Sequence, residues 1–180
     1  NALDRMERTT SELLDLAKME AGKSTLHWED FDIVQLAERI KEQFGGQAHK
    51  KSLILKGDFP SHSSMMIRAA RDKISRVFIN FLSNAAKFTE AGTIELAVRD
   101  LGDQVECSVS DTGSGIAPED LPKVFSKFEQ FGRKGRSEIY GTGLGLSICQ
   151  EIINLHRGTI WVESELGKGS RFAFRIPKKI

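Results

Sequence analysis

Apolar residues recur at helical spacing in the first part of the chain. Residues 1–22 contain no proline and place a seam at alternating intervals of three and four, which predicts a helix that ends at Gly22. The seam is imperfect, since a threonine falls on it, and it consists of Leu3, Met6, Thr10, Leu13 and Ala17. Because a lone short helix is unstable in water, we expect it to pack against another helix or another chain.

Three further segments have one apolar face at the helical period. The first begins at Asp32, whose carboxylate can cap it, and Gly45 and Gly46 are expected to end it. The others cover about residues 70–88 and 144–156. Each of the three helices is expected to bury its apolar face against a core.

Alternating apolar and polar residues between these helices predict strands. Short strands are expected at residues 26–31, 53–55 and 65–67, and two hairpins at residues 94–109 and 160–176. Antiparallel hairpins interleaved with helices favour an α+β fold over a doubly wound parallel fold. We expect a two-layer α/β sandwich in which helices cover one face of a mixed, mostly antiparallel sheet, preceded by the N-terminal helix.

Charge and cysteine content narrow the function classes. The chain has 26 Lys and Arg against 25 Asp and Glu, and the net charge of +1 gives no basic field for nucleic acid. Cys107 and Cys149 lack CxxC spacing and lie in apolar segments, so we expect buried thiols in a reducing, cytosolic setting. Since no apolar run is long enough to span a bilayer, any membrane anchor of the parent protein would lie outside this chain.

A polar line runs beside the apolar face of the helix predicted at residues 70–88. Asn80, Asn84 and Lys87 are spaced by four and three, so they project from one face on successive turns. The three could be solvated surface residues. Alternatively, the amide oxygens can orient a magnesium ion while the lysine neutralises phosphate oxygens.

The next motif follows directly after a predicted strand, where Asp111, Gly113, Gly115 and Ile116 form a DxGxGI sequence. Such a sequence is a weak signal by itself, because turns are rich in aspartate and glycine. Its chemical use would be specific, since a buried carboxylate accepts a hydrogen bond from the exocyclic amine of adenine. Glycines let the backbone approach the ring closely.

A third motif, Gly141-Thr142-Gly143-Leu144-Gly145-Leu146, opens the last predicted helix. Helix N-termini present unsatisfied N–H groups, which suits phosphate, although the glycines could serve only in a turn. Residues 125–130 and then Arg133, Lys134, Arg136 and Tyr140 lie between this motif and the preceding one. That segment is either a solvated loop or a lid that brings guanidinium groups to the phosphates of a nucleotide.

Taken in order, these motifs resemble the N, G1, F and G2 boxes of the GHKL ATP-binding fold in its sensor histidine kinase form. The boxes would be residues 80–88, 111–116, 125–130 and 141–146. Four ordered motifs are far more specific than any one of them, and the match covers most of the chain. The resemblance implies a catalytic domain at residues 25–180. It implies that residues 1–24 are the C-terminal part of the helical hairpin that dimerises and carries the phosphoacceptor.

The resemblance also implies roles for single residues. Asn84 would ligate the Mg²⁺ that bridges the ATP phosphates, with Asn80 supporting the same metal site, and Asp111 would read adenine. Catalysis would depend on Asn80, Lys87 and Arg133. The residues expected to bind ATP are Asn84, Lys87, Phe88, Asp111, Gly113, Gly115, Ile116, Phe128, Arg133, Tyr140, Gly141, Thr142, Gly143, Leu144, Gly145, Leu146 and Ser170.

The identity of residue 80 bears on the reaction class. The ATPase branch of the same fold typically places a glutamate there to activate water, whereas an amide cannot accept a proton usefully. Asn80 therefore favours a kinase that holds ATP until a protein histidine arrives. An ATPase, or a nucleotide-binding scaffold that signals without chemistry, stays open as an alternative.

The expected phosphoacceptor is a histidine followed by an acidic residue, on a helix before residue 1. The four histidines present, His27, His49, His62 and His156, lack that context and are expected to be structural or solvated. The family resemblance implies that the phosphoryl group passes on to an aspartate of a response regulator. It also implies a cytosolic domain that forms a homodimer through the first helix in the intact protein.

Overall fold

A five-stranded sheet forms one layer of the structure. The computed structural model describes residues 2–60, 64–129 and 142–179. The strands are β2 (Leu53–Asp58), β4 (Gly92–Asp100), β5 (Gln104–Asp111), β6 (Thr159–Glu165) and β7 (Gly169–Pro177), and they lie in the order β2-β4-β5-β7-β6. Only the β2–β4 pair is parallel among them, so the predicted mixed and mostly antiparallel sheet is confirmed.

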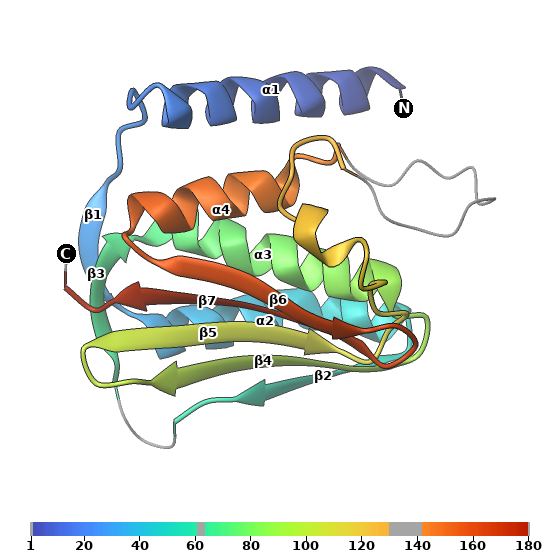
Figure 1. Ribbon diagram of the computed structural model, residues 1–180. Helices are drawn as coiled ribbons and strands as arrows, with labels where there is room; N and C mark the ends of the chain where they lie inside the picture. The colour runs from blue at the N-terminus through green and yellow to red at the C-terminus, as the bar shows by residue number, and fades with distance from the viewer. Residues whose placement is uncertain (1, 61–63, 130–141, 180) are drawn as a thin grey trace.

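Helices form the second layer on one face of this sheet, as Figure 1 shows. They are α2 (Ile33–Lys50), α3 (Arg71–Phe88) and α4 (Gly145–Leu155). A two-stranded sheet of β1 (Trp28–Asp32) and β3 (Met66–Ala70) closes one end, and α1 (Ala2–Glu20) lies across α4. The predicted two-layer α/β sandwich with an additional N-terminal helix is therefore confirmed.

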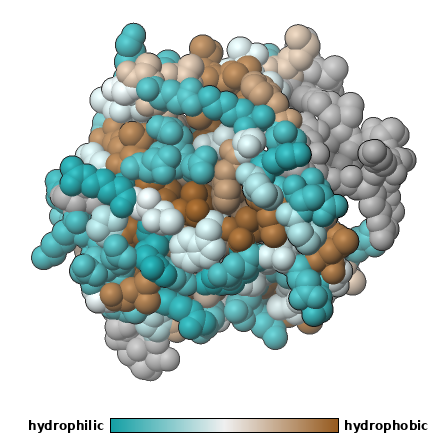
Figure 2. Space-filling view, in the orientation of Figure 1, coloured by the Kyte–Doolittle hydropathy of each residue, from teal (hydrophilic) through white to brown (hydrophobic). Residues whose placement is uncertain are grey.

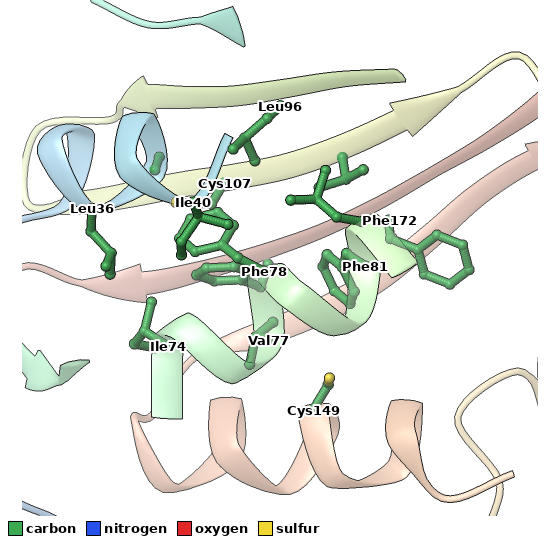
Figure 3. Close-up of a cluster of buried hydrophobic side chains, with 14 of the residues drawn as sticks. Leu36, Ile40, Ile74, Val77, Phe78, Phe81, Leu96, Cys107, Cys149 and Phe172 are labelled. Atoms are coloured by element: carbon green, nitrogen blue, oxygen red, sulfur yellow. The ribbon is translucent and has the colours of Figure 1, made fainter. Parts of the chain in front are cut away.

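Apolar side chains from both layers make one core. Phe78 and Phe81 of α3 are fully buried against Phe174 and Phe172 of β7, with ring centroids 5.5 Å apart in the Phe78–Phe174 and Phe81–Phe172 pairs. Figure 3 shows these rings meeting side chains of α2 and the sheet, with Cys149 of α4 on the far side of α3. Burying one such ring contributes on the order of 1.5–3 kcal/mol, so α3 is held firmly between the sheet and α4.

The end of α2 corrects the sequence prediction. Gly45 and Gly46 were expected to stop this helix, but it continues to Lys50. Phe44 and Ala48, one turn apart, are both buried on the face toward the core. Their packing outweighs the helix penalty of two glycines, which is about 1 kcal/mol each. The predicted cap is confirmed, because the Asp32 carboxylate accepts hydrogen bonds from the backbone N–H groups of Val34 (2.9 Å) and Gln35 (3.4 Å) in the first turn of α2.

The packing face of α1 also differs from the prediction. Leu16 and Met19 are buried where α1 meets α4, whereas Met6 and Leu13 of the predicted seam are 68% and 41% exposed. Figure 2 shows hydrophobic atoms along the upper edge of the molecule, where α1 lies, and separate patches below it. The helix thus packs against α4 through a second apolar face and leaves Met6, Thr10 and Leu13 of the predicted seam exposed.

The C-terminal end of β7 is fastened to two other elements. The backbone N–H of Arg68 in β3 donates to the Lys178 carbonyl at 2.8 Å, and the Lys178 N–H donates to the Asp103 carbonyl at 2.8 Å. The Lys178 ammonium lies 2.6 Å from the Asp100 carboxylate. These contacts hold residue 178 beside the β1–β3 end of the structure.

Two smaller expectations concern cysteines and membrane spans. Cys107 and Cys149 are both free and fully buried, as predicted, and burial raises the pKa of the Cys149 thiol to about 12. Over the described residues, no helix has the length and apolar content needed to cross a bilayer.

Candidate functional site

The polar line of α3 lies at its C-terminal half, pointing away from the buried Phe78 and Phe81. The Asn84 side-chain N–H donates to the Asn80 carbonyl oxygen at 3.1 Å. This bond uses the carbonyl of Asn80 and leaves the carbonyl oxygen of Asn84 available to a ligand. One turn further, the Lys87 ammonium lies 4.5 Å from the centre of the Phe88 ring.

The glycine-rich helix start packs directly on this line. A methyl group at Gly145 would displace the side-chain amide of Asn80, so the first turn of α4 approaches α3 closely at this glycine. Leu144, the residue that caps α4, offers no side-chain hydrogen bond to the first N–H groups of the helix. The first N–H groups and the positive end of α4 therefore lie beside Asn80, which suits an anion next to a cation.

The DxGxG loop is fastened to the end of α3. The Gly113 N–H donates to the Asp111 carboxylate at 2.8 Å, and the Ser114 N–H donates to the Phe88 carbonyl at 3.1 Å. A side chain at Gly113 would collide with both the Phe88 carbonyl and the carboxylate. These contacts bring Asp111, at the end of β5, to the same end of the molecule as the asparagines and the start of α4 (Figure 1).

Asp111 is a buried carboxyl group in the middle of this arrangement. Burial raises its pKa above the ordinary value, while hydrogen bonds from the Gly113 and Ser170 backbone, together with the nearby Thr89 hydroxyl, pull the pKa back down. A carboxylate removed from water accepts hydrogen bonds more strongly than an exposed one. It is therefore suited to read a hydrogen-bond donor on a ligand.

Ser170 belongs to a small hydroxyl network beside Asp111, its partner in the β5–β7 ladder. Its hydroxyl lies 3.0 Å from that of Ser164, which accepts a hydrogen bond from the Ile116 N–H at 2.8 Å and donates to the Gly169 carbonyl. The β6–β7 hairpin thereby braces the loop that carries Ile116. Ser164 was not among the predicted residues, because a serine that pairs across a hairpin has no signature in the sequence.

Phe128 connects residues 125–129 of the F box to the start of α4. Its N–H donates to the Gly143 carbonyl at 2.9 Å, its φ of 64° is left-handed, and its ring is 58% exposed. The predicted lid residues Arg133 and Tyr140, with Gly141 of the G2 box, lie outside the described residues. Leu144, predicted at the nucleotide, is fully buried in the core, and Leu146 packs against it.

Comparison with known families shows to which family the region with these motifs belongs. Residues 69–180 match the family described as histidine kinase-, DNA gyrase B- and HSP90-like ATPase. The chain belongs to this ATPase family. The matched region contains α3, the DxGxG loop and the start of α4, which are the three parts that converge.

Within the ATPase family, the similar proteins are sensor kinases. The chain is 37% identical over 98% of its length to sensor histidine kinase TmoS of Ectopseudomonas mendocina and 36% identical over 94% to circadian input-output histidine kinase CikA of Synechococcus elongatus. It covers only 18% and 23% of those proteins. The chain thus corresponds to about a fifth of each of these relatives.

Solved structures of histidine kinases share the fold. Full-length ShkA in complex with AMPPNP superimposes with a TM-score of 0.85, at 31% identity over 97% of this chain and 36% of ShkA. The catalytic domain of ThkA gives 0.75, at 31% identity over 86% of this chain and 99% of that domain. A third structure, ThkA in complex with the response regulator protein TrrA, gives a TM-score of 0.78 at 30% identity. The similarity covers 99% of this chain and 48% of that ThkA chain.

The ATPase-family body also contacts α1 through three polar pairs. The Thr142 hydroxyl donates to the Glu12 carboxylate, Arg76 pairs with Asp15 at 2.8 Å, and Lys127 pairs with Glu20 at 2.6 Å. These contacts could not be predicted from local pattern, because each joins residues more than 60 positions apart. They connect the first helix to the G2 box, to α3 and to the F box.

An open cavity of about 490 Å³ lies under α1, where it is lined in part by residues 125–127 of the F box. Residues of α1, of the segment after the 3₁₀ helix η1 (Leu121–Lys123) and of α4 line it, among them Leu16, Phe125 and Gln150. Its lining includes no residue of the N or G1 box. The candidate nucleotide site is therefore the region where the motifs converge, whereas this cavity belongs to the interface with α1.

Proposed function

We propose that this chain is the Mg-ATP-binding catalytic domain of a sensor histidine kinase. It would transfer the γ-phosphoryl group of ATP to a histidine outside the chain, for relay to an aspartate of a response regulator. One observation carries the proposal: the Asn80–Asn84 pair, the first N–H groups of α4 and the buried Asp111 carboxylate come together at one end of the fold.

The residues present fit a magnesium ion that is shared with a nucleotide. Among the described residues no cluster of three His, Cys, Asp or Glu side chains could hold a metal without help. Mg²⁺ usually keeps few protein ligands and takes the rest from phosphates and water. Asn84 offers the free carbonyl oxygen, Asn80 orients it, and the bound ion would supply charge neutralisation to the phosphates.

A histidine nucleophile is favoured over water by the identity of residue 80. A general base at this position would need to accept a proton, which an amide does not do at neutral pH. The imidazole would attack the γ-phosphorus, forming a P–N bond as the bond to the β,γ-bridging oxygen breaks and ADP leaves. Lys87, Arg133 and the N-terminus of α4 would stabilise the charge on the phosphoryl group in transit.

The remaining parts of the proposal rest on the family resemblance and on the relatives. Residues 1–24 would be the end of the dimerisation hairpin and residues 25–180 the catalytic domain of a cytosolic homodimer. The complex of ThkA with TrrA supports a response-regulator partner, since the similarity to ThkA extends over 99% of this chain, although it covers 48% of ThkA.

Calorimetry with ATP, with and without Mg²⁺, tests the proposal at the level of binding. We expect magnesium-dependent affinity that falls at least roughly tenfold in Asn84→Ala, equivalent to about 1.4 kcal/mol. Asp111→Asn should lose affinity similarly, because the carboxylate acceptor for adenine is replaced in part by a donor. An affinity that ignores Mg²⁺ and both substitutions would refute the assignment.

Label transfer separates the kinase from the alternatives. Radiolabelled ATP and a separately purified hairpin domain with its histidine should give labelled hairpin only when the unsubstituted chain is present. ATP binding without any transfer would favour a signalling scaffold. Steady phosphate release by this chain alone, abolished by Asn80→Ala, would favour the ATPase alternative.

A further inference from the structure

The side-chain hydroxyl of Thr89 is an unsatisfied polar group in the core of the site. Thr89 is only 2% exposed, and its hydroxyl oxygen has no hydrogen-bond partner among the described residues. Leaving a buried hydroxyl unpaired costs about 1–3 kcal/mol. Buried groups of this kind are rare in native proteins, and a ligand-dependent role is one physical reason for keeping one.

Thr89 occupies the point where the end of α3 meets the DxGxG loop. Its backbone N–H closes the helix by donating to the Ala85 carbonyl at 3.0 Å. The residue before it, Phe88, accepts a hydrogen bond from Ser114, and Gly113 packs against that same carbonyl and the Asp111 carboxylate. The backbone of α3 before Thr89 and the DxGxG loop packed on it therefore hold the Thr89 side chain near the Asp111 carboxylate.

The hydroxyl is near enough to Asp111 to lower the pKa of that carboxyl, yet it does not reach hydrogen-bonding geometry. One carboxylate oxygen of Asp111 is already bound to the Gly113 N–H at 2.8 Å. The Ser170 backbone also donates to this carboxyl group. A side-chain donor in addition to these two backbone donors would fix the plane of the carboxylate further, and the Thr89 hydroxyl is a buried donor beside it.

We propose that Thr89 is a positioning residue for adenine recognition: when a 6-aminopurine binds, its hydroxyl donates to the Asp111 carboxylate and fixes the oxygen that accepts from the exocyclic amine. This inference rests on the proposed function. It assigns part of the selectivity for adenine to a residue that contacts the base only through Asp111. The unpaired hydroxyl then gains its partner in the bound state.

A purely structural role for Thr89 makes a different prediction for nucleotide affinity. If the side chain only fills space, Thr89→Val should bind nucleotides like the unsubstituted chain. Valine keeps the shape and removes an unpaired buried hydroxyl, so the melting temperature of Thr89→Val should stay the same or rise in either case. A loss of ligand affinity without a loss of stability therefore identifies the positioning role.

The test compares two nucleotides on three proteins by calorimetry at saturating Mg²⁺. The nucleotides are ATP and purine riboside triphosphate, which lacks the 6-amino group, and the proteins are the unsubstituted chain, Thr89→Val and Thr89→Ser. We expect Thr89→Val to weaken ATP roughly five- to tenfold, as loss of about one hydrogen bond would do. Affinity for the analogue should change less than about twofold. Thr89→Ser, which keeps the hydroxyl, should bind ATP as the unsubstituted chain does.

Each other outcome overturns a specific part of the argument. Equal weakening of both nucleotides by Thr89→Val, or no weakening of ATP, would overturn the positioning role while ATP binding itself stands. Failure of Thr89→Ser to retain affinity would also overturn it. Absence of ATP binding by the unsubstituted chain would overturn the proposed function, and the inference with it.

Discussion

Single residues set the distance between the elements of the site. Gly145 lets α4 approach Asn80, and Gly113 lets the DxGxG loop lie on the Phe88 carbonyl. The sequence identified both as members of glycine motifs, but their roles depend on neighbours from other elements. A glycine needed for close approach and a glycine in a turn look alike in a sequence.

Replacing Gly145 with alanine tests the close approach. Its methyl group would displace the Asn80 amide and break the Asn80–Asn84 arrangement, so we expect Mg-ATP affinity to fall at least roughly tenfold. Calorimetry gives the affinity, and circular dichroism verifies the fold. Affinity equal to that of the unsubstituted chain would show that the contact with Asn80 is not required.

Gly46→Ala is the matched control and a prediction of its own. Gly46 lies inside α2 with no atom near the position of an added methyl group. Alanine in a helix interior is more favourable than glycine by about 1 kcal/mol, so the free energy of unfolding should rise by about that amount with ATP affinity unchanged. Urea unfolding measures the first quantity, and a destabilised variant would contradict the helical role of residue 46.

At the scale of elements, His156 joins the end of α4 to the β1–β3 end of the molecule. It is fully buried, its ring lies 4.9 Å from that of Trp28, and its Nε2 accepts from the Ala70 N–H at 3.0 Å. The Nδ1 atom lies 2.7 Å from the Ile152 carbonyl, so it carries the proton. The ring is therefore held neutral with both nitrogens in use.

Burial lowers the pKa of His156 below its ordinary value, against opposing effects of the Ile152 carbonyl and Asp72. The unfolded chain therefore takes up the proton first as pH falls. Stability should be complete above about pH 6.5 and decrease below it. Thermal melting between pH 7.5 and 5 should show a smaller decrease for His156→Gln than for the unsubstituted chain. His49→Gln, at an exposed position on α2, should leave the pH dependence unchanged.

The three polar pairs of α1 make a second prediction at this scale. The combined change Asp15→Asn and Glu20→Gln removes both ion pairs, each of which contributes roughly 0.2–1 kcal/mol. We expect faster amide exchange in residues 9–20 with little change in β5 or β7. Asp30→Asn breaks an exposed pair with Arg68 elsewhere and should not affect α1. If amide exchange in residues 9–20 is equally fast in the double variant and the unsubstituted chain, burial of Leu16 and Met19 is enough to hold α1 on α4.

The helices and strands could be predicted from periodicity, whereas some of their ends and packing faces are determined by tertiary contacts. The α3 segment and both hairpins follow from local pattern, because their apolar faces are strong. The extension of α2 through Gly45 and Gly46 could not be predicted, because it is stabilised by burial of Phe44 and Ala48, which happens only in the folded core. The same holds for Leu16 and Met19, whose partner α4 is more than 120 residues away.

At the scale of the whole molecule, the exposed seam of α1 predicts self-association. Met6 and Leu13 face solvent on a helix that contacts the domain through another face. Sedimentation at high concentration should show dimers that Leu13→Glu dissociates. Leu101→Glu, at an exposed position in the β4–β5 turn, should leave the dimer intact. A strictly monomeric chain would contradict this expectation.

How much of the site was foreseeable differs along the chain. The four motifs located its parts because glycine, asparagine and aspartate have restricted backbone or chemical uses. Thr89 and Ser164 were not foreseeable, since the position of a hydroxyl between two elements depends on their packing. The roles of Arg133 and Tyr140 stay predictions, because these residues lie outside the described part of the chain.

The backbone hydrogen bonds of residue 178 to β3 and to the β4–β5 turn make this residue a useful position for a spectroscopic label. A fluorophore attached at Lys178 would report the orientation of the ATPase-family body, because backbone hydrogen bonds fix that position on two sides. Paired with a second dye near Met6, at the far end of α1, it would read the angle between helix and body directly. Nucleotide titrations could then follow whether that angle changes in solution.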